Sequence, residues 1–196
     1  MRNPLSPHGD KDHMGEAKKI VESISVNKVI FNVGSYNYLE KDLIKTLKKK
    51  NIRYYKNIEN IYIGNTPIYF LNTGVYNNEN DNSNVIYFIV NNYKFLLMGD
   101  AGVDKEKDIL NEYSIEDIEF LKVGHHGSDT SSSKEFIDIM NPKYSIISVG
   151  ENNRYNHPKK SVLNTLSNSK IYRTDKDGSI EIKIKSAGYS IETCSS

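Results

Sequence analysis

The sequence has little cysteine, little proline, no tryptophan and no long apolar run. A single cysteine, Cys194, cannot form an internal disulfide, and thiolate metal sites need several cysteines, so both kinds of scaffold are excluded. No stretch of about 18 apolar residues occurs, so we predict no membrane-spanning helix. The first 15 residues contain no apolar segment of the signal-peptide type. From this chain alone we expect a cytoplasmic location.

An excess of charge of one sign is also missing. Lys and Arg number 26 and Asp and Glu number 25, which gives a formal net charge of +1. This balance argues against strong non-specific binding to nucleic acid, which needs clustered cations. The densest basic stretch, residues 45–50, is interpreted as the solvated end of a helix. With neither a repeat nor a Pro/Gly/Ser linker, residues 1–196 are predicted to form a single domain.

Apolar periodicity predicts an α/β protein. Helices are expected over residues 14–24 and 39–47, from Asp104 onward, over 132–140, and from Pro158 to about residue 167. Strands are expected over residues 26–33, 52–55, 58–71, 84–90, 93–98, 118–123, 144–149, 171–173, 179–184 and 189–193, with a hairpin across Asn91-Asn92. Alternating helices and strands together with hairpins indicate mixed sheets with helices on the outside.

The five histidines carry most of the chemical signal, because each lies at a junction between predicted elements. His8, Asp10, Asp12 and His13 fall within six residues, immediately before or at the start of the first predicted helix. His8 and Asp10 can share one ion, and Asp12 and His13 can face a second. Asp100 follows an apolar strand and a glycine, and its carboxylate can bridge two ions. A polar loop with an aspartate N-cap is the alternative for the first cluster.

Two further loops hold candidate site residues. His125 and His126 follow a strand and lie between two glycines, and either can be a metal ligand. Ser128 begins a hydroxyl-rich segment suited to helix capping or to anion binding. In the second loop, Arg154 could contact a phosphate and His157 could donate a proton to a leaving group.

As an ordered set, these motifs resemble the metallo-β-lactamase superfamily. The first motif reads His8-x-Asp10-x-Asp12-His13, with an aspartate in the second histidine position. Together with Gly-Asp100, Gly-His125-His126-Gly-Ser and Asn-Arg-Tyr-Asn-His157-Pro, it is similar to the hydrolase domain of ComEC-type DNA-uptake (competence) proteins. The resemblance covers residues 8–184 and implies an αβ/βα sandwich with mixed sheets. Members of this family are attached to a membrane channel.

The sequence departs from the family pattern in two places. Strands normally precede the first motif, so we expect a domain that is N-terminally incomplete, with its first strands missing. Apolar residues near 26–33 and 61–71 would then be partly exposed. No histidine lies between the first motif and Asp100, so Asp81 or Asn82 could substitute as a ligand.

The resemblance implies a metal-dependent hydrolase, a phosphodiesterase or nuclease acting on DNA in competence-type uptake. We predict metal ligands at His8, Asp10, Asp12, His13, Asp100, His125 and His126, catalytic roles for Asp12 and His157, and substrate contacts from Ser128 and Arg154. Two divalent ions are expected, Mn²⁺ or Zn²⁺ with Mg²⁺ also compatible, because oxygen donors replace some histidines. The alternatives are a truncated non-catalytic remnant or binding module, or a hydrolase of a small phosphodiester such as a phosphorylcholine ester.

Overall fold

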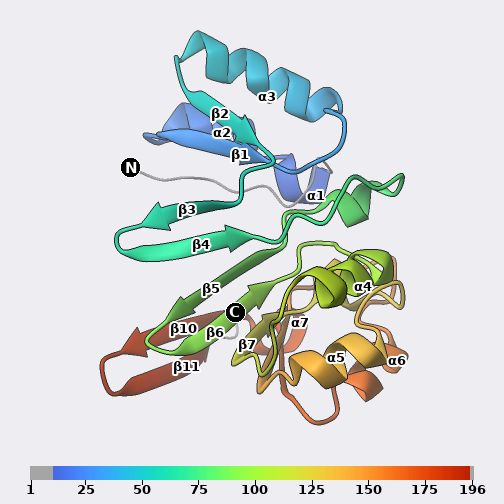
Figure 1. The fold of residues 1–196 in the computed structure, drawn as a ribbon. Coiled ribbons are helices and arrows are strands. Elements are labelled where there is room, and N and C mark those ends of the chain that lie inside the picture. The colour runs from blue at the N-terminus through green and yellow to red at the C-terminus, as the bar shows by residue number, and fades with distance from the viewer. Residues whose placement is uncertain (1–10, 195–196) are drawn as a thin grey trace.

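The computed structural model describes residues 11–194, with side chains from His13 onward. The chain folds into four layers, in which helices cover the outer faces of a two-stranded and a seven-stranded sheet packed on each other, and a third sheet is a hairpin (Figure 1). This αβ/βα sandwich is the architecture predicted from the sequence. The helices are α1 (Lys11–Met14), α2 (Ala17–Ser23), α3 (Tyr38–Lys49), α4 (Val103–Glu112), α5 (Lys134–Met140), α6 (Lys160–Thr165) and α7 (Thr174–Asp177), with 3-10 turns η1 (Glu79–Asn82) and η2 (Gly124–Gly127).

The first two layers come from the amino-terminal part of the chain. Strands β1 (Lys28–Phe31) and β2 (Arg53–Lys56) pair in parallel, and α2 and α3 cover them. Helix α3 begins with a capping box, in which the Asn37 side chain accepts from the Glu40 backbone and Glu40 accepts from the Asn37 backbone. Its buried face, which includes Leu43 and Leu47, packs on Val29 and Phe31 of β1.

The third layer is a seven-stranded sheet in sequence order. It consists of β3 (Asn60–Ile63), β4 (Thr66–Phe70), β5 (Ile86–Val90), β6 (Tyr93–Leu97), β7 (Phe120–Lys122), β8 (Tyr144–Ile147) and β9 (Lys170–Arg173). The first four strands pair antiparallel and the last four pair in parallel. The predicted hairpin is confirmed, because Asn91 and Asn92 both adopt positive φ, as a two-residue type I′ turn requires.

The two faces of this sheet pack against different partners. Leu96, Leu121 and Ile147 face α4, α5 and α6 in the main core, and these helices gather on one side of the sheet in Figure 1. On the other face, Ile30 of β1 packs among apolar residues of β3, β4 and β5. The hairpin of β10 (Ser179–Lys185) and β11 (Gly188–Cys194) lies on the same face, where Tyr189 meets Phe120 edge-on.

Three predictions need correction. The expected helix over 14–24 is two helices separated at Gly15 and Glu16, where glycine lowers helix propensity. The expected strand over 58–71 is the β3–β4 hairpin, which turns at Gly64 with φ 60°. The apolar residues of 26–33 are not exposed, because β1 is buried between α3 and the large sheet.

Only some of the apolar residues near 61–71 show the exposure that the sequence predicted. Ile61, Ile68 and Phe70 are buried, whereas Tyr62 and Ile63 are 65% and 57% exposed. Among residues 11–194, none of the helices combines the length and the apolar character that crossing a bilayer requires.

Candidate metal centre

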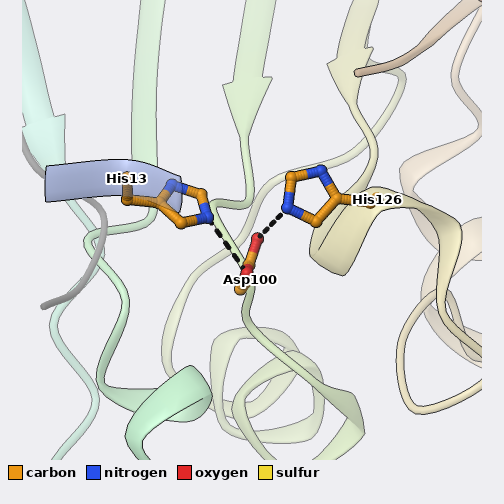
Figure 2. Close-up of side chains that lie close together, drawn as sticks. All are labelled: His13, Asp100 and His126. Carbon is orange, nitrogen blue, oxygen red and sulfur yellow. Dashed lines mark hydrogen bonds and ion pairs between the residues drawn. The ribbon is translucent and has the colours of Figure 1, made fainter. Parts of the chain in front are cut away.

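Three of the predicted site residues meet at one point. His13 Nε2 lies 3.0 Å from Asp100 Oδ2, and His126 Nε2 lies 3.6 Å from Asp100 Oδ1. One ligand atom from each residue falls within 4.8 Å of the others. Figure 2 shows the two imidazoles reaching from α1 and from η2 toward the carboxylate between them. Residues separated by 87 positions in the chain are thus brought to hydrogen-bonding distance.

The carboxylate of Asp100 is fixed just beyond the carboxyl end of β6. Gly99 adopts φ 60° and turns the chain out of the strand, a conformation that glycine adopts without strain. The Asp100 backbone N–H donates to Ser83 Oγ at 3.1 Å, and the Asp100 side chain is 4% exposed. A carboxylate so deeply buried is stable in ionised form only beside cations or hydrogen-bond donors.

A strained backbone sets the orientation of the His125 and His126 side chains. His125 and His126 have φ 46° and 55°, the left-handed region that side chains seldom occupy. Two hydrogen bonds hold this turn, from His125 N to Gly99 O and from Ser128 N to His125 O. At Gly127 an added Cβ would lie 2.5 Å from Pro158 Cβ, so the site loops approach closely only because this residue is glycine.

The donor set of the three residues fits a divalent cation. His126 Nδ1–H donates to the Ser148 carbonyl at 2.7 Å, which directs the Nε2 lone pair of a neutral imidazole toward Asp100 Oδ1. A cation between these two atoms, which lie 3.6 Å apart, would be coordinated by both of them. A backbone carbonyl behind a ligating histidine is the usual outer partner in metal sites. These residues could therefore hold a metal ion of the kind that takes nitrogen and oxygen ligands.

His125 lies beside this group and has a different partner. Its Nδ1 is 3.1 Å from Thr130 Oγ1, which in turn is 3.0 Å from Ser128 Oγ. Its ring centroid is 6.5 Å from that of His126. The geometry therefore favours His126 over its neighbour as the ligand that accompanies Asp100. Ser128 is buried and supports the loop through Thr130, so its predicted contact with substrate stays a prediction.

His157 and Arg154 lie on the loop that follows β8. Asn153 fixes this loop, because its Oδ1 accepts from His157 N and its Nδ2 donates to His157 O. The His157 ring centroid is 6.0 Å from that of His125. Within the described part of the chain, His157 Nδ1 is buried without a hydrogen-bond partner. Burial, and then the charge of Lys159, lower the pKa of His157. Helix α6 begins at Lys160, so Pro158 precedes the helix instead of opening its first turn.

Lys122, a buried residue near the site, was not identified from the sequence. Lys122 lies on β7 within the sheet and its Nζ donates to the Val123 carbonyl at 2.9 Å. Burial lowers the pKa of Lys122, and the charge of Asp100 opposes that shift. A lysine inside an otherwise apolar strand could have indicated this residue, because a buried ammonium group needs a nearby anion.

The other predicted ligands do not all lie in the described part of the chain. His8, Asp10 and the Asp12 side chain fall outside the described residues. Asp81 accepts from Gly102 N and Asn78 Nδ2 and does not join the three-residue group. Asn82 Oδ1 accepts from Tyr76 N and its Nδ2 donates to Tyr76 O, so this side chain stabilises the loop.

A large cavity lies away from the three-residue group. Its volume is about 810 Å³, and residues of β3, β4, β5 and the segment after α4 line it. None of the predicted site residues contributes to its wall.

The chain is similar in sequence to a known protein family. A family model described as the metallo-beta-lactamase superfamily matches residues 8–151. ComE operon protein 3 of Bacillus subtilis (strain 168) is 29% identical over 185 residues, covering 91% of this chain and 24% of that protein. Competence protein ComA of Neisseria gonorrhoeae is 32% identical over 113 residues, 56% of this chain and 16% of that protein. The chain thus spans about a quarter or less of these curated relatives.

Solved structures share the fold at low sequence identity. A mutant of CmlA beta-hydroxylase superposes with a TM-score of 0.56 at 11% identity, covering 87% of this chain and 42% of that one. The metallo-beta-lactamase fold protein YhfI from Bacillus subtilis gives 0.52 at 9% identity, covering 87% and 83%. With the family model matching most of its length, this chain belongs to the metallo-β-lactamase superfamily, whose members are typically metal-dependent hydrolases.

Proposed function

We propose that this chain is a metal-dependent phosphodiesterase that cleaves DNA. The observation that carries the proposal is the convergence of His13, Asp100 and His126 at the carboxyl ends of β6 and β7. Loops at this end of parallel strands are where α/β proteins place their sites. Two relatives are named for competence or its operon, which supports a role for this domain in DNA uptake.

The residues of the site have separable tasks in this reaction. His13, Asp100 and His126 would hold the metal, together with the first-motif residues His8, Asp10 and Asp12. Bound divalent ions lower the pKa of a water and stabilise charge on a phosphoryl oxygen. The Ser148 carbonyl holds His126 in the tautomer that leaves Nε2 facing the site.

Other residues would act on the phosphodiester itself. The His157 ring is the neighbour of the His125 ring, and His157 would hold a proton at the leaving-group oxygen. Thr130 and Ser128 orient His125, and Arg154 at the rim would pair with a phosphate oxygen. The aspartates of the first motif favour Mn²⁺, and Zn²⁺ and Mg²⁺ remain compatible with the donor set.

The test separates activity from metal content. The purified chain is stripped with chelator, reloaded with Mn²⁺ or Zn²⁺, and its metal content is measured by mass spectrometry. Cleavage is then followed with labelled single-stranded DNA, duplex DNA, bis(p-nitrophenyl) phosphate and p-nitrophenylphosphorylcholine. We expect DNA cleavage that needs metal and that falls at least about 100-fold in Asp100→Asn.

A matched control is Asp104→Asn, which makes the same change at an exposed position in the first turn of α4. This variant should retain wild-type cleavage. Hydrolysis of the phosphorylcholine ester without DNA cleavage would replace DNA with a small phosphodiester as the substrate. Absence of bound metal and of all hydrolysis would identify a non-catalytic module.

A further inference from the structure

A continuous series of aromatic and cationic groups leads from the surface to the metal centre. In order, the series is Arg154, Tyr155, His157, His125, His126 and His13. The Arg154 guanidinium carbon lies 4.6 Å from the Tyr155 ring centroid. The Tyr155 and His157 rings are nearly parallel, at 18° and 5.7 Å. Each later ring centroid lies 5.6 to 6.5 Å from the next.

The outer end of the series is exposed although it is held in place. Tyr155 is 55% exposed although its ring lies against Arg154 and His157. The Arg154 guanidinium also donates to the Tyr155 hydroxyl. Lys159 Nζ donates to the Tyr155 carbonyl at 2.7 Å. The Arg154 contacts restrain the Tyr155 ring, the Lys159 bond restrains its backbone, and Asn153 anchors the rest of the loop.

Such an arrangement fits an unpaired nucleic-acid strand better than a duplex. Tyrosine rings and arginine guanidinium planes are the surfaces on which unpaired bases stack. In a duplex each base face is covered by its neighbours, so a ring at the rim finds no free face. The local cations Arg154 and Lys159 can pair with phosphates, while the near-neutral chain offers little general attraction to a duplex.

From this geometry we infer that Arg154 and Tyr155 form a stacking platform for a base that flanks the scissile phosphodiester of a single strand. The inference rests on the proposed function and deepens it by naming the substrate class. With a base on Tyr155, the adjoining phosphate is directed toward His157, and the metal-centre residue His126 is three ring-to-ring steps from Tyr155. Tyr155 is therefore a residue that determines specificity for single strands.

The experiment measures binding without cleavage. Fluorescein-labelled oligo-dT is titrated with the full chain in chelator, and fluorescence anisotropy gives the dissociation constant. Tyr155→Leu removes the ring and retains apolar bulk, and it should weaken binding about 5- to 100-fold. Tyr155→Phe keeps the ring and should stay within about twofold of the wild type. Tyr38→Leu makes the same change at a tyrosine 74% exposed on α3 and should have no effect.

The outcomes separate this inference from the proposed function. Equal binding by Tyr155→Leu and wild type would overturn the inference, as would an equal loss of affinity for duplex DNA, or a wild type that does not bind oligo-dT. A protein that binds oligo-dT through Tyr155 but leaves it uncut with Mn²⁺ would support the platform and refute the nuclease. If Tyr155→Leu lowers the melting temperature, two other results test the inference: Tyr155→Phe should still bind like the wild type, and the KM for oligo-dT of metal-loaded Tyr155→Leu should be raised.

Discussion

Replacing Glu106 is expected to loosen the loop that supports the metal centre. Glu106 lies on α4 and its side chain is almost fully buried. Its Oε1 accepts from Ser132 N at 2.5 Å and its Oε2 accepts from Ser133 N at 2.9 Å. The segment it holds begins at Ser128 and includes Thr130, which contacts His125. Glu106→Ala therefore removes the partner of two backbone donors close to the site.

The size of the effect follows from these two bonds. A buried donor left without a partner costs about 1–3 kcal/mol. Ser132 is buried and Ser133 is half-buried, so water can replace the bond to Ser133 more easily. We therefore expect Glu106→Ala to lower the free energy of unfolding by about 2–4 kcal/mol. For a domain of this size that corresponds to a melting temperature lower by roughly 4–16 °C.

The measurement is urea and thermal unfolding of the metal-free chain. Glu106→Gln keeps one acceptor and should lose about half as much. Glu135→Ala, an exposed glutamate in the first turn of α5, is the matched control and should cost a few tenths of a kcal/mol. A loss below about 1 kcal/mol in Glu106→Ala, or one equal to the control, would refute the reasoning from buried hydrogen bonds.

Three further predictions concern other parts of the molecule. Mn²⁺ at about 100 times its dissociation constant should raise the melting temperature of the wild type by roughly 5–11 °C, and the rise should vanish in Asp100→Asn, as thermal shift assays can show. Burial lowers the pKa of Lys105 to about 8, so its ionised form costs stability that is recovered as pH rises from about 8 toward 10.5. Lys105→Met also loses the contact with the Tyr76 ring, and the net result should be a stabilisation of about 1–2 kcal/mol at pH 7. In urea unfolding, this advantage over the wild type should shrink by pH 10. Ile89, 43% exposed on β5, is expected to promote association at high concentration, so Ile89→Glu should elute later than the wild type on size exclusion, and identical elution would contradict this.

The fold was predictable where the signal is local. The hairpin at Asn91-Asn92 depends on two residues that tolerate positive φ, and helix α3 depends on its own apolar spacing and capping residues. The β3–β4 hairpin was missed because Gly64 is one glycine in a long strand-like pattern. Burial of β1 on both faces was missed because it depends on a sheet formed later in the chain.

The site was predictable as a set of residue types, and its geometry was not. Histidines and aspartates at junctions between predicted elements marked His13, Asp100 and the pair at 125–126 as candidates. Which histidine of the pair faces Asp100 depends on the Ser148 carbonyl, a backbone atom that carries no sequence signal. The support of Asp100 by Ser83 likewise depends on a loop 17 positions away in sequence.

The strained turn at the histidine pair explains how one loop serves two neighbouring tasks. Successive side chains on an extended strand point to opposite faces, so two adjacent histidines would normally diverge. Left-handed backbone at both His125 and His126 brings their rings to 6.5 Å, at a cost of about 1–3 kcal/mol for each residue. Hydrogen bonds to Gly99, Ser148 and Thr130 offset this cost. As a result His126 faces Asp100 while His125 faces the loop of His157, which joins the metal centre to the residues proposed to hold the substrate.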